Sequence, residues 1–230
     1  MRATNLLCSV ATVIVAAFSC PPGTAMDLPM PGVAHFSVNV TSMAAQRFAT
    51  TVRQQYDFSC GSAALATLLT YHYHVPVTEA AVFQRMYQDG DQAKIRREGF
   101  SLLDMQRFLA RRGLRADGFQ QPLDKLFANR LPAIVLLSEN GYHHFVVVKG
   151  GDSERVLLGD PSMGTRSMPR ERFEALWPSK LLFVIHGYQG QITFNGQPDW
   201  RAAPMAPLAQ AVDRSMLTNI TLPRHGPGEF

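Results

Sequence analysis

The hydrophobic pattern of this chain changes period near its middle, and that change limits the fold more than any other feature. Between residues 60 and 127, apolar side chains mostly recur every three or four positions, as they do along one face of a helix. From residue 132 onward, short β-branched and aromatic runs are separated by turn residues, among them Asn140 and Gly141. Helices followed by an antiparallel run of strands predict an α+β fold.

The first half predicts four helices whose ends carry typical start and stop residues. Thr78 and Ser101 are placed as N-caps of the second and third helices, and Gly113 ends the third. We expect helices over residues 60–73, 78–89, 101–112 and 122–127, a short strand over residues 115–119, and a surface loop over the polar residues 89–100.

The second half predicts an antiparallel meander with a helix before its last strand. We expect strands over residues 132–137, 142–149, 155–158 and 181–185, a short stretch near Arg166, and a helix through Phe173 and Trp177. Gly150 and Gly151 are expected to form a turn after the second strand. Beyond His186 the pattern weakens, so we expect a poorly packed extension over residues 188–230, with weak helical periodicity over residues 208–217.

The N-terminus has the composition of an export signal. Arg2 supplies a positive charge, residues 6–18 form an apolar run, and residues 23–25 form a small-residue cleavage site. These features predict a signal peptide over residues 1–25 and a periplasmic location. A less favoured alternative makes Cys20 the lipidated first residue of a lipoprotein.

Composition and charge suit one globular domain rather than a nucleic-acid binder. Of the 230 residues, 46% are hydrophobic and 17% are charged, so the chain can bury a full core. The net charge is +4, but the basic residues are scattered, with the longest cluster at residues 94–97. No aromatic residues interleave with that cluster, so we expect no nucleic-acid partner. We expect residues 26–47 to be a linker, and we find no transmembrane stretch after the signal.

The cysteine count favours a functional role for one thiol. The chain holds Cys8, Cys20 and Cys60, and the first two fall within or beside the signal. Once the signal is removed, Cys60 has no partner for an internal disulfide. An unpaired thiol in an oxidising compartment risks oxidation unless it is buried or useful. The same count argues against a zinc-finger site, which needs several cysteines.

Cys60 also stands where a reactive thiol is expected, at the start of a helix. Ser59 is placed as the N-cap, and Leu65, Leu68 and Leu69 follow with helical spacing. Unpaired N–H groups at a helix start favour the thiolate, which is the nucleophilic form of the side chain. The alternative is a buried structural cysteine, so the assignment needs partners elsewhere in the chain.

His144 and Asp160 are candidate partners because two successive strands should bring them together. His144 lies at the start of one strand, and Asp160 ends the next strand, just before Pro161. A hairpin places the start of one strand beside the end of the next. Alternation points the adjacent His143 to the opposite face. We therefore expect His144 as the base and Asp160 as the acceptor that orients it.

Gln54 completes the set, because it lies ahead of Cys60 in the approach to the helix. A side-chain amide there can donate to a developing oxyanion together with the Cys60 backbone N–H. Each polar residue also has an ordinary explanation: a surface histidine, an aspartate in an Asp–Pro turn, or a solvated glutamine. The joint occurrence of Cys60, His144, Asp160 and Gln54 favours an acyl-transfer site.

These residues and their context resemble the C39 peptidases, papain-like domains that cut bacteriocin precursors after double-glycine leaders. The resemblance covers about residues 48–187 and rests on Gln54, Cys60, Gly61, Ala63 and Leu65, the run from His144 to Val147, and Asp160, Pro161 and Gly164. It implies a papain-like fold. It also implies Cys60 as nucleophile, His144 as base, Asp160 as the orienting residue and Gln54 as oxyanion donor, without a metal or other cofactor.

The expected activity follows from the resemblance and the signal together. We expect an exported cysteine peptidase that cleaves a peptide or protein partner through a thioester at Cys60. Standalone relatives accompany secretion or surface-fibre systems, which implies an exported amyloid-like or adhesin-like partner. Two alternatives stay open: a non-catalytic C39-like module that binds an exported chain, and a papain-like acyl transferase that passes the thioester to an amine.

Overall fold

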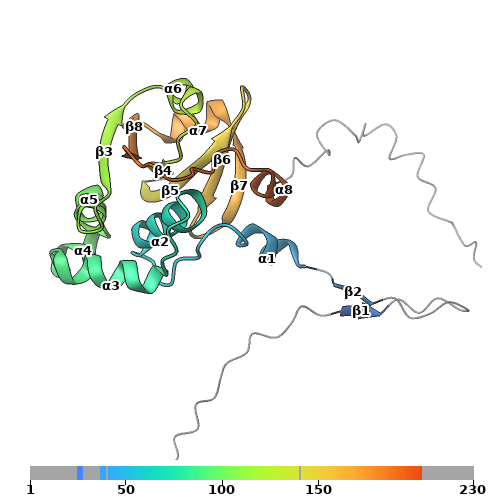
Figure 1. Ribbon diagram of the computed structural model, residues 1–230, viewed down its shortest axis with the longest axis horizontal. Helices are drawn as coiled ribbons and strands as arrows, with labels where there is room; N and C mark the ends of the chain where they lie inside the picture. Colours follow the sequence, from blue (N-terminus) through green and yellow to red (C-terminus); the bar gives the residue numbers. More distant parts are fainter. Residues whose placement is uncertain (1–24, 28–36, 40, 140, 204–230) are drawn as a thin grey trace, which may run out of the picture. The chain divides into compact units, whose positions relative to one another are not determined.

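The computed structural model describes residues 25–27, 37–39, 41–139 and 141–203, which divide into two units (Figure 1). In the unit Met1–Ser42, strand β1 (Ala25–Asp27) pairs antiparallel with β2 (Ser37–Asn39). The unit Met43–Phe230 contains all the other helices and strands named below. The expected signal up to residue 24, with Cys20, and the helical stretch 208–217 lie outside the described residues.

Most helices of the larger unit lie in its first half, and α7 (Arg170–Leu176) and α8 (Gln197–Ala202) follow later. Those of the first half are α1 (Met43–Arg47), α2 (Cys60–Thr67) with its continuation as a π-helical turn η1 (Leu68–His72), α3 (Glu79–Asp89), α4 (Gln92–Glu98), α5 (Leu102–Ala110) and α6 (Leu123–Ala128). Thr78 caps α3, and Ser101 forms a reciprocal capping box with Asp104 at α5, as the sequence predicts.

The expectation of a surface loop over residues 89–100 is wrong, because helix α4 occupies most of it. The Asp91 side chain caps this helix by accepting from the Lys94 N–H at 3.0 Å. Only Ile95 in α4 is buried, at 2% exposure. One apolar residue among polar ones gives no periodic signal, which is why the pattern did not predict this helix.

A six-stranded antiparallel sheet forms the second half, and it confirms the α+β fold class. Its strands are β3 (Arg115–Gln120), β4 (Ala133–Glu139), β5 (Tyr142–Gly151), β6 (Arg155–Asp160), β7 (Gly164–Pro169) and β8 (Leu181–His186). The order across the sheet is β3-β8-β4-β5-β6-β7 (Figure 1). Strands β4 to β7 form a meander, but the last strand, β8, lies between β3 and β4 instead of continuing it as expected.

The alternation of side chains along β5 separates two buried clusters. Phe145 and Val147 belong to the cluster that contains α2 and α5, while Val146 and Val148 belong to the cluster under α6 and α7 (Arg170–Leu176). In Figure 1, α2 to α5 group together on one side of the sheet, and α6 and α7 lie at another edge. Phe145, the residue after His144, belongs to the same cluster as Cys60 and lies close to Gly61, so the start of β5 lies beside the first turn of α2.

Gly150 and Gly151 do not form the expected turn but lie buried inside β5. The register of β5 against β6 shifts between Val148 and Gly150, which leaves Lys149 as the extra residue of a β-bulge. A Cβ atom at Gly150 would lie 2.7 Å from the backbone of Asn195. Glycine is needed here because the chain beyond β8 packs directly against the strand.

The expectation of a poorly packed extension is wrong for residues 188–203. Helix α8 (Gln197–Ala202) follows an irregular segment, and Phe194 and Asp199 are buried at 6% and 4% exposure. The Thr193 N–H donates to the His72 carbonyl at 2.8 Å, and the Asn195 N–H donates to the Lys149 carbonyl at 2.8 Å. This packing had no sequence signal because single hydrogen bonds and one buried charge leave no hydrophobic period.

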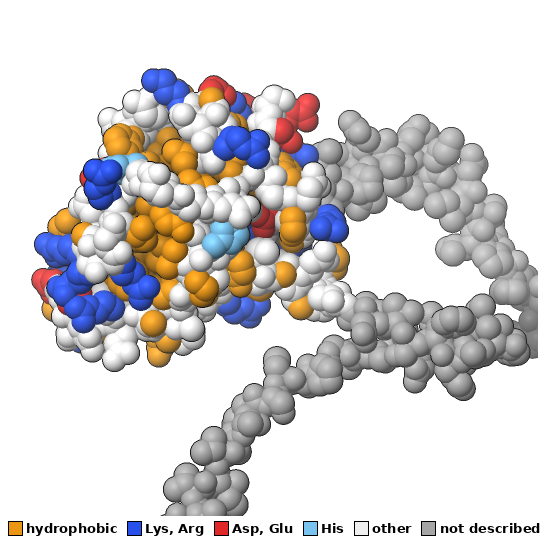
Figure 2. All heavy atoms as spheres, in the orientation of Figure 1, with side chains coloured by type: hydrophobic (Ala, Val, Ile, Leu, Met, Phe, Trp, Pro, Cys, Tyr) orange, Lys and Arg blue, Asp and Glu red, His pale blue; other side chains and the backbone are white. Residues whose placement is uncertain are grey.

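Some of the basic residues that are scattered along the sequence lie together in space. Figure 2 shows a group of Lys and Arg side chains over the helices α3, α4 and α5, and others spread over the rest of the visible face. Several of them are paired, as Arg85 and Arg111 are with Asp89 at 2.9 and 3.1 Å. Among the described residues, no helix combines the length and the apolar character needed to cross a membrane.

Candidate active site

Cys60 is the first residue of α2, and its free thiol is 8% exposed. Ser59 stands at the N-cap position, but its hydroxyl does not cap the helix as expected. Instead it accepts from the Tyr56 N–H at 3.1 Å and donates to the Tyr56 carbonyl at 3.0 Å. Ser59 therefore fixes the loop before the helix, and it leaves the N–H groups of the first turn without a side-chain cap.

Gly61 explains how the start of α2 sits so deep in the domain. A Cβ atom at this position would lie 2.9 Å from the Met105 Cε and 3.0 Å from the Phe100 Cβ. Glycine permits the close approach, and Ala63 and Ala64 continue the small-residue surface at 0% exposure. Close packing of this turn fixes where the Cys60 side chain points.

The structure brings His144 and Asp160 together across the β5–β6 hairpin. The His144 Nε2 contacts the Asp160 Oδ1 at 2.8 Å, and both residues are buried, at 8% and 1% exposure. The register explains the contact, because Val147 pairs with Gly159 and the start of β5 therefore lies beside the end of β6. This is the adjacency that the hairpin argument predicts.

His144 keeps a proton more tightly than a free histidine does. Burial alone would lower its pKa, but the hydrogen bond with Asp160, the nearby Cys60 side chain and the charges of both outweigh it and raise the pKa to about 9. Burial opposes the charge on Asp160 in turn, yet its hydrogen bond with His144 leads the influences that hold the Asp160 pKa well below its usual range. The pair therefore favours an imidazolium beside a carboxylate.

The two nitrogens of His144 have different roles. Asp160 takes Nε2, whereas Nδ1 is buried and has no hydrogen-bond partner among the described residues. Cys60 is nevertheless near enough to raise the His144 pKa. Nδ1 is therefore the atom available for proton exchange with the thiol.

Asp160 has more partners than the sequence suggested. Its Oδ1 also accepts from the Ser162 N–H at 2.9 Å, the Ser162 hydroxyl at 2.7 Å and the Met163 N–H at 3.2 Å. Its Oδ2 accepts from Arg166, with the Nε at 3.0 Å and the second guanidinium nitrogen at 2.9 Å. The Asp–Pro turn hinted at the local donors, but nothing in the pattern of β7 singled out Arg166.

Tyr142 is a second residue that the sequence did not point to. Its ring stacks on the His144 ring, with centroids 5.8 Å apart and an interplanar angle of 25°. Its hydroxyl donates to the Asp57 carbonyl at 3.4 Å, in the loop before Cys60. Burial raises the Tyr142 pKa, and the nearby Cys60, Asp57 and Asp160 raise it further. Tyr142 thus spans from the sheet to the loop that leads to Cys60.

Gln54 is hydrogen-bonded to the segments beside Cys60 and Asp160. Its N–H donates to the Pro161 carbonyl at 3.0 Å, which joins the segment before α2 to the turn after Asp160. Its side-chain Nε2 donates to the Tyr56 carbonyl at 3.1 Å and reaches the Asp57 carbonyl at 3.5 Å. The longer contact is weak, so that N–H is the one most easily redirected to an oxyanion.

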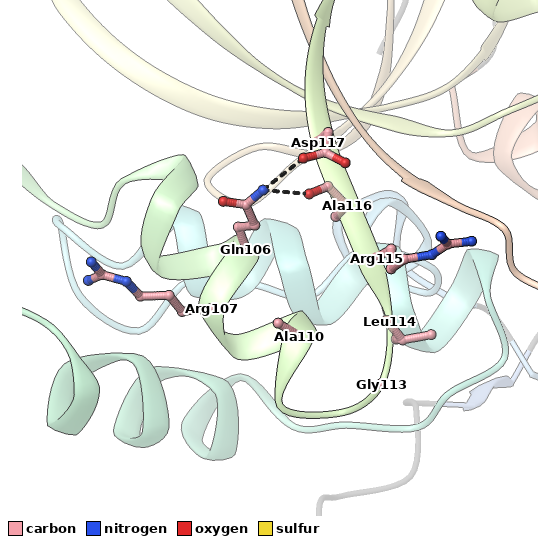
Figure 3. A pocket seen from close by; sticks show the side chains of 8 residues that line it. All are labelled: Gln106, Arg107, Ala110, Gly113, Leu114, Arg115, Ala116 and Asp117. Carbon is pink, nitrogen blue, oxygen red and sulfur yellow. Dashed lines mark hydrogen bonds between the residues drawn. The ribbon is translucent and has the colours of Figure 1, made fainter.

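A hollow elsewhere on the surface has no part in this site. It has a volume of about 430 Å³ and lies between α5 and β3, where Gln106 bonds to the Ala116 carbonyl at 3.0 Å and to Asp117 at 2.9 Å (Figure 3). Its lining residues are Gln106, Arg107, Ala110, Gly113, Leu114, Arg115, Ala116 and Asp117. None of the candidate site residues is among them.

A cysteine at a helix start, facing a histidine and an aspartate on an antiparallel sheet, defines a papain-like cysteine peptidase domain. The model of the peptidase C39 family matches residues 49–188. The chain belongs to the peptidase C39 family and is a cysteine peptidase.

Two curated relatives and one solved structure agree with this assignment. The chain is 40% identical to proteins named "Probable functional amyloid protease FapD" from Pseudomonas fluorescens and Pseudomonas aeruginosa. The two matches span 158 and 160 residues, which is 69% of this chain in both cases and 70% and 71% of the relatives. The crystal structure of the peptidase domain of Streptococcus ComA, a bi-functional ABC transporter involved in a quorum-sensing pathway, shares the fold. That match has a TM-score of 0.50 and 22% identity, and it covers 59% of this chain and 96% of that domain.

Proposed function

We propose that this peptidase is exported and cleaves a peptide or protein partner in the periplasm through a thioester on Cys60. One observation carries the catalytic part: His144 holds Asp160 through Nε2 and leaves Nδ1 unpaired beside a free thiol. A base that is held on one side and open on the other is the arrangement that nucleophilic catalysis by cysteine requires.

The proposed chemistry uses each residue at a stated atom. The Cys60 sulfur attacks the scissile carbonyl carbon, and His144 gives the proton on Nδ1 to the leaving amine as the C–N bond breaks. Water then attacks the thioester and gives a proton to the same nitrogen, and the thiolate leaves to release a carboxylic acid. Asp160 stays ionised and keeps the ring oriented throughout.

The proposed oxyanion donors are the Cys60 backbone N–H and the Gln54 amide. The first lies at the start of α2, where N–H groups have no intrahelical acceptor. The second would redirect the N–H that now reaches the Asp57 carbonyl at 3.5 Å. Two donors aimed at the developing charge stabilise the transition state more than the ground state.

The proposed partner is an exported amyloid-like protein of a secretion or surface-assembly system. Support comes from the relatives named as functional amyloid proteases, which are 40% identical to this chain. The signal-like composition of residues 1–25 supports an exported enzyme. Fractionation of cells that express the full chain tests the location, and recovery of the uncleaved chain in the cytoplasm would contradict it.

The nucleophile is tested with an alkylating probe and paired histidine variants. In the chain from which residues 1–25 have been removed, Cys60→Ala should abolish labelling by iodoacetamide and all cleavage of a co-expressed amyloid-like partner. His144→Ala should slow labelling strongly, while His143→Ala, its exposed neighbour on β5, should label like the unmodified protein. Cleavage that survives Cys60→Ala would sink the proposal.

A further inference from the structure

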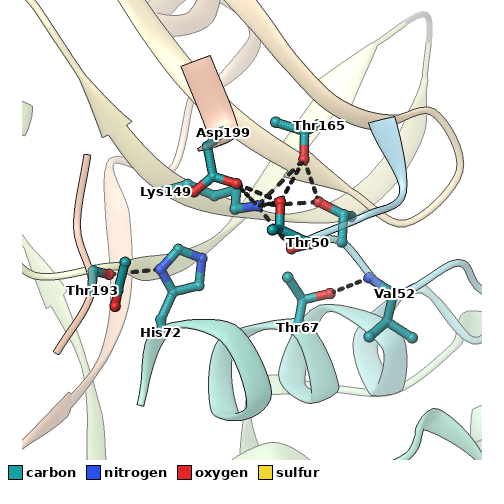
Figure 4. Close-up of polar contacts among 9 residues, drawn as sticks. Thr50, Val52, Thr67, His72, Lys149, Thr165, Thr193 and Asp199 are labelled. Carbon is teal, nitrogen blue, oxygen red and sulfur yellow. Dashed lines mark hydrogen bonds and ion pairs between the residues drawn. The ribbon is translucent and has the colours of Figure 1, made fainter. Parts of the chain in front are cut away.

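A second polar cluster lies buried beneath the site and has no role in the chemistry above. Its centre is Lys149, whose side chain has no solvent exposure and forms an ion pair with Asp199 (Figure 4). The Lys149 ammonium donates to the Thr50 carbonyl at 2.8 Å and to the Thr50 hydroxyl at 2.9 Å. Longer contacts reach the hydroxyls of Thr165 at 3.3 Å and Thr51 at 3.4 Å. The ammonium is thus surrounded by acceptors.

The threonine partners of Lys149 come from segments that lead to the candidate active site. Lys149 itself is on β5, the strand that carries His144 near its start. Thr50 and Thr51 stand in the segment that continues to Gln54, and the Thr51 and Thr165 hydroxyls lie 2.7 Å apart. Thr165 directly precedes Arg166, which binds Asp160. One ammonium therefore ties together three parts of the chain that carry the site.

The β-bulge in β5 makes this arrangement possible. Lys149 is the extra residue, and its side chain runs past Gly159, where a Cβ atom would lie 3.0 Å from the Lys149 Cδ. Its carbonyl, free of the β6 ladder, accepts from the Asn195 N–H at 2.8 Å. Lys149 thus contacts the chain beyond β8 twice: its carbonyl binds Asn195, and its ammonium binds the Asp199 carboxylate.

Asp199 supplies the negative charge from a segment outside the family match at residues 49–188. The approach to α8 is fixed a second time by His72, whose Nδ1 contacts the Thr193 carbonyl at 2.7 Å (Figure 4). Burial and the charge of Lys149 together lower the His72 pKa to about 4, so the ring is neutral and its Nδ1–H donates. A buried ammonium without its carboxylate would be strongly disfavoured.

We propose that Asp199 is a positioning residue for catalysis. By neutralising Lys149 it keeps the ammonium bonded to Thr50, Thr51 and Thr165, and so holds the Gln54 segment, the His144 strand and the Arg166 strand in register. Helix α8 is on this view part of the active unit of the enzyme. The inference rests on the proposed roles of Gln54, His144 and Asp160.

The experiment compares four variants of the full chain, each assayed for its unfolding midpoint and for iodoacetamide labelling of Cys60 across pH. Asp199→Asn should slow labelling at pH 6 by about tenfold to a hundredfold and move the acid limb of the profile to higher pH, because the thiol and His144 no longer meet correctly. Arg201→Ala, on the exposed side of α8, should change neither property. Labelling needs no substrate, so this result stands apart from any failure to find the proposed partner.

A paired replacement separates positioning from packing. Lys149→Met with Asp199→Leu removes both charges and refills the space, so the unfolding midpoint should return to that of the unmodified protein or above it. The labelling profile should stay shifted, because methionine cannot donate to the Thr50 carbonyl. Recovery of the profile together with the midpoint would overturn the proposal, as would an unshifted profile in Asp199→Asn.

A conservative variant covers the case in which the paired replacement does not fold. Asp199→Glu keeps the charge one methylene further out, and its labelling profile should lie nearer to the unmodified protein than that of Asp199→Asn, at a temperature where both are folded. Equal shifts in the two variants would show that the charge does not position the site and would overturn the proposal.

Discussion

Strand β5 carries two ion pairs of opposite character, His144 with Asp160 near its start and Lys149 with Asp199 at its bulge. Every hydrogen-bonding direction of the Lys149 ammonium is met by a carbonyl, a hydroxyl or the carboxylate. His144 by contrast keeps Nδ1 without a hydrogen-bond partner among the described residues. The satisfied pair can only hold its neighbours, whereas the pair with one open atom can exchange a proton.

The two pairs also respond differently to burial. The pKa of His144 rises to about 9, because the hydrogen bond with Asp160, the nearby Cys60 side chain and the charges of both outweigh the cost of burial. The pKa of Lys149 falls, because burial outweighs the opposing charge of Asp199. An aspartate partner alone therefore does not decide the direction of a pKa change. The degree of burial and the second partner do.

The largest effect is expected when the pair of His144 and Asp160, here called the reactive pair, is broken. His144→Ala should lower kcat/KM by about a thousandfold or more, because it removes the group that moves the proton. His143→Ala on the same strand should leave kcat/KM unchanged, since that side chain is exposed and points the other way. Equal losses in both variants would mean that the strand, and not the imidazole, carries the effect.

The next largest effect is on stability, and it is expected when the satisfied pair of Lys149 and Asp199 is broken. Asp199→Asn should lower the free energy of unfolding by about 3–5 kcal/mol, because it leaves an ammonium buried without its counter-charge. Urea unfolding at constant pH measures this. Asp124→Asn, which removes the pair of this exposed carboxylate with Arg170, should change the unfolding midpoint far less. A similar loss in both variants would contradict the contrast between buried and exposed pairs.

A third prediction concerns pH and the contact between His144 and Asp160. The imidazolium is present below the raised pKa, so kcat/KM should fall as the pH rises through about 9. Asp160→Asn removes the hydrogen bond and the charge that raise this pKa, so the alkaline limb should move down toward about 6.5. The stability that the pair contributes follows the same sign: it is complete below about pH 6.5 and lost as the pH passes about 9. An alkaline limb that stays near pH 9 in the variant would contradict this assignment.

Much of the reactive pair could be predicted from the sequence, because its geometry follows from local rules. A helix start places Cys60, and a hairpin between two strands of β-rich sequence brings His144 next to Asp160. The α+β order of elements follows from the change of period at residue 132. These relations involve neighbouring elements, so periodicity and turn residues are enough to predict them.

The residues that surround the pair could not be predicted, because they meet through long-range contacts without a pattern. Arg166 reaches Asp160 from β7, and Asp199 reaches Lys149 from a segment whose sequence lacks any clear period. The bulge at Lys149 is a single inserted residue, which shifts the register of a strand without changing its composition. Such features become visible only when the sheet is assembled.

The smallest effect on kcat/KM is expected at Tyr142, which borders the reactive pair. Tyr142→Ala removes the ring stacked on His144 and should lower kcat/KM by about fivefold, in line with the ~1 kcal/mol typical of an aromatic contact. Tyr142→Phe keeps the ring and loses only the 3.4 Å contact to the Asp57 carbonyl, so it should stay within about twofold. Phe119→Ala is the matched control, because Phe119 contacts His186 away from the site. If Tyr142→Phe loses as much as Tyr142→Ala, the bridge to the loop before Cys60, and not the shielding of the imidazole, is what the residue contributes.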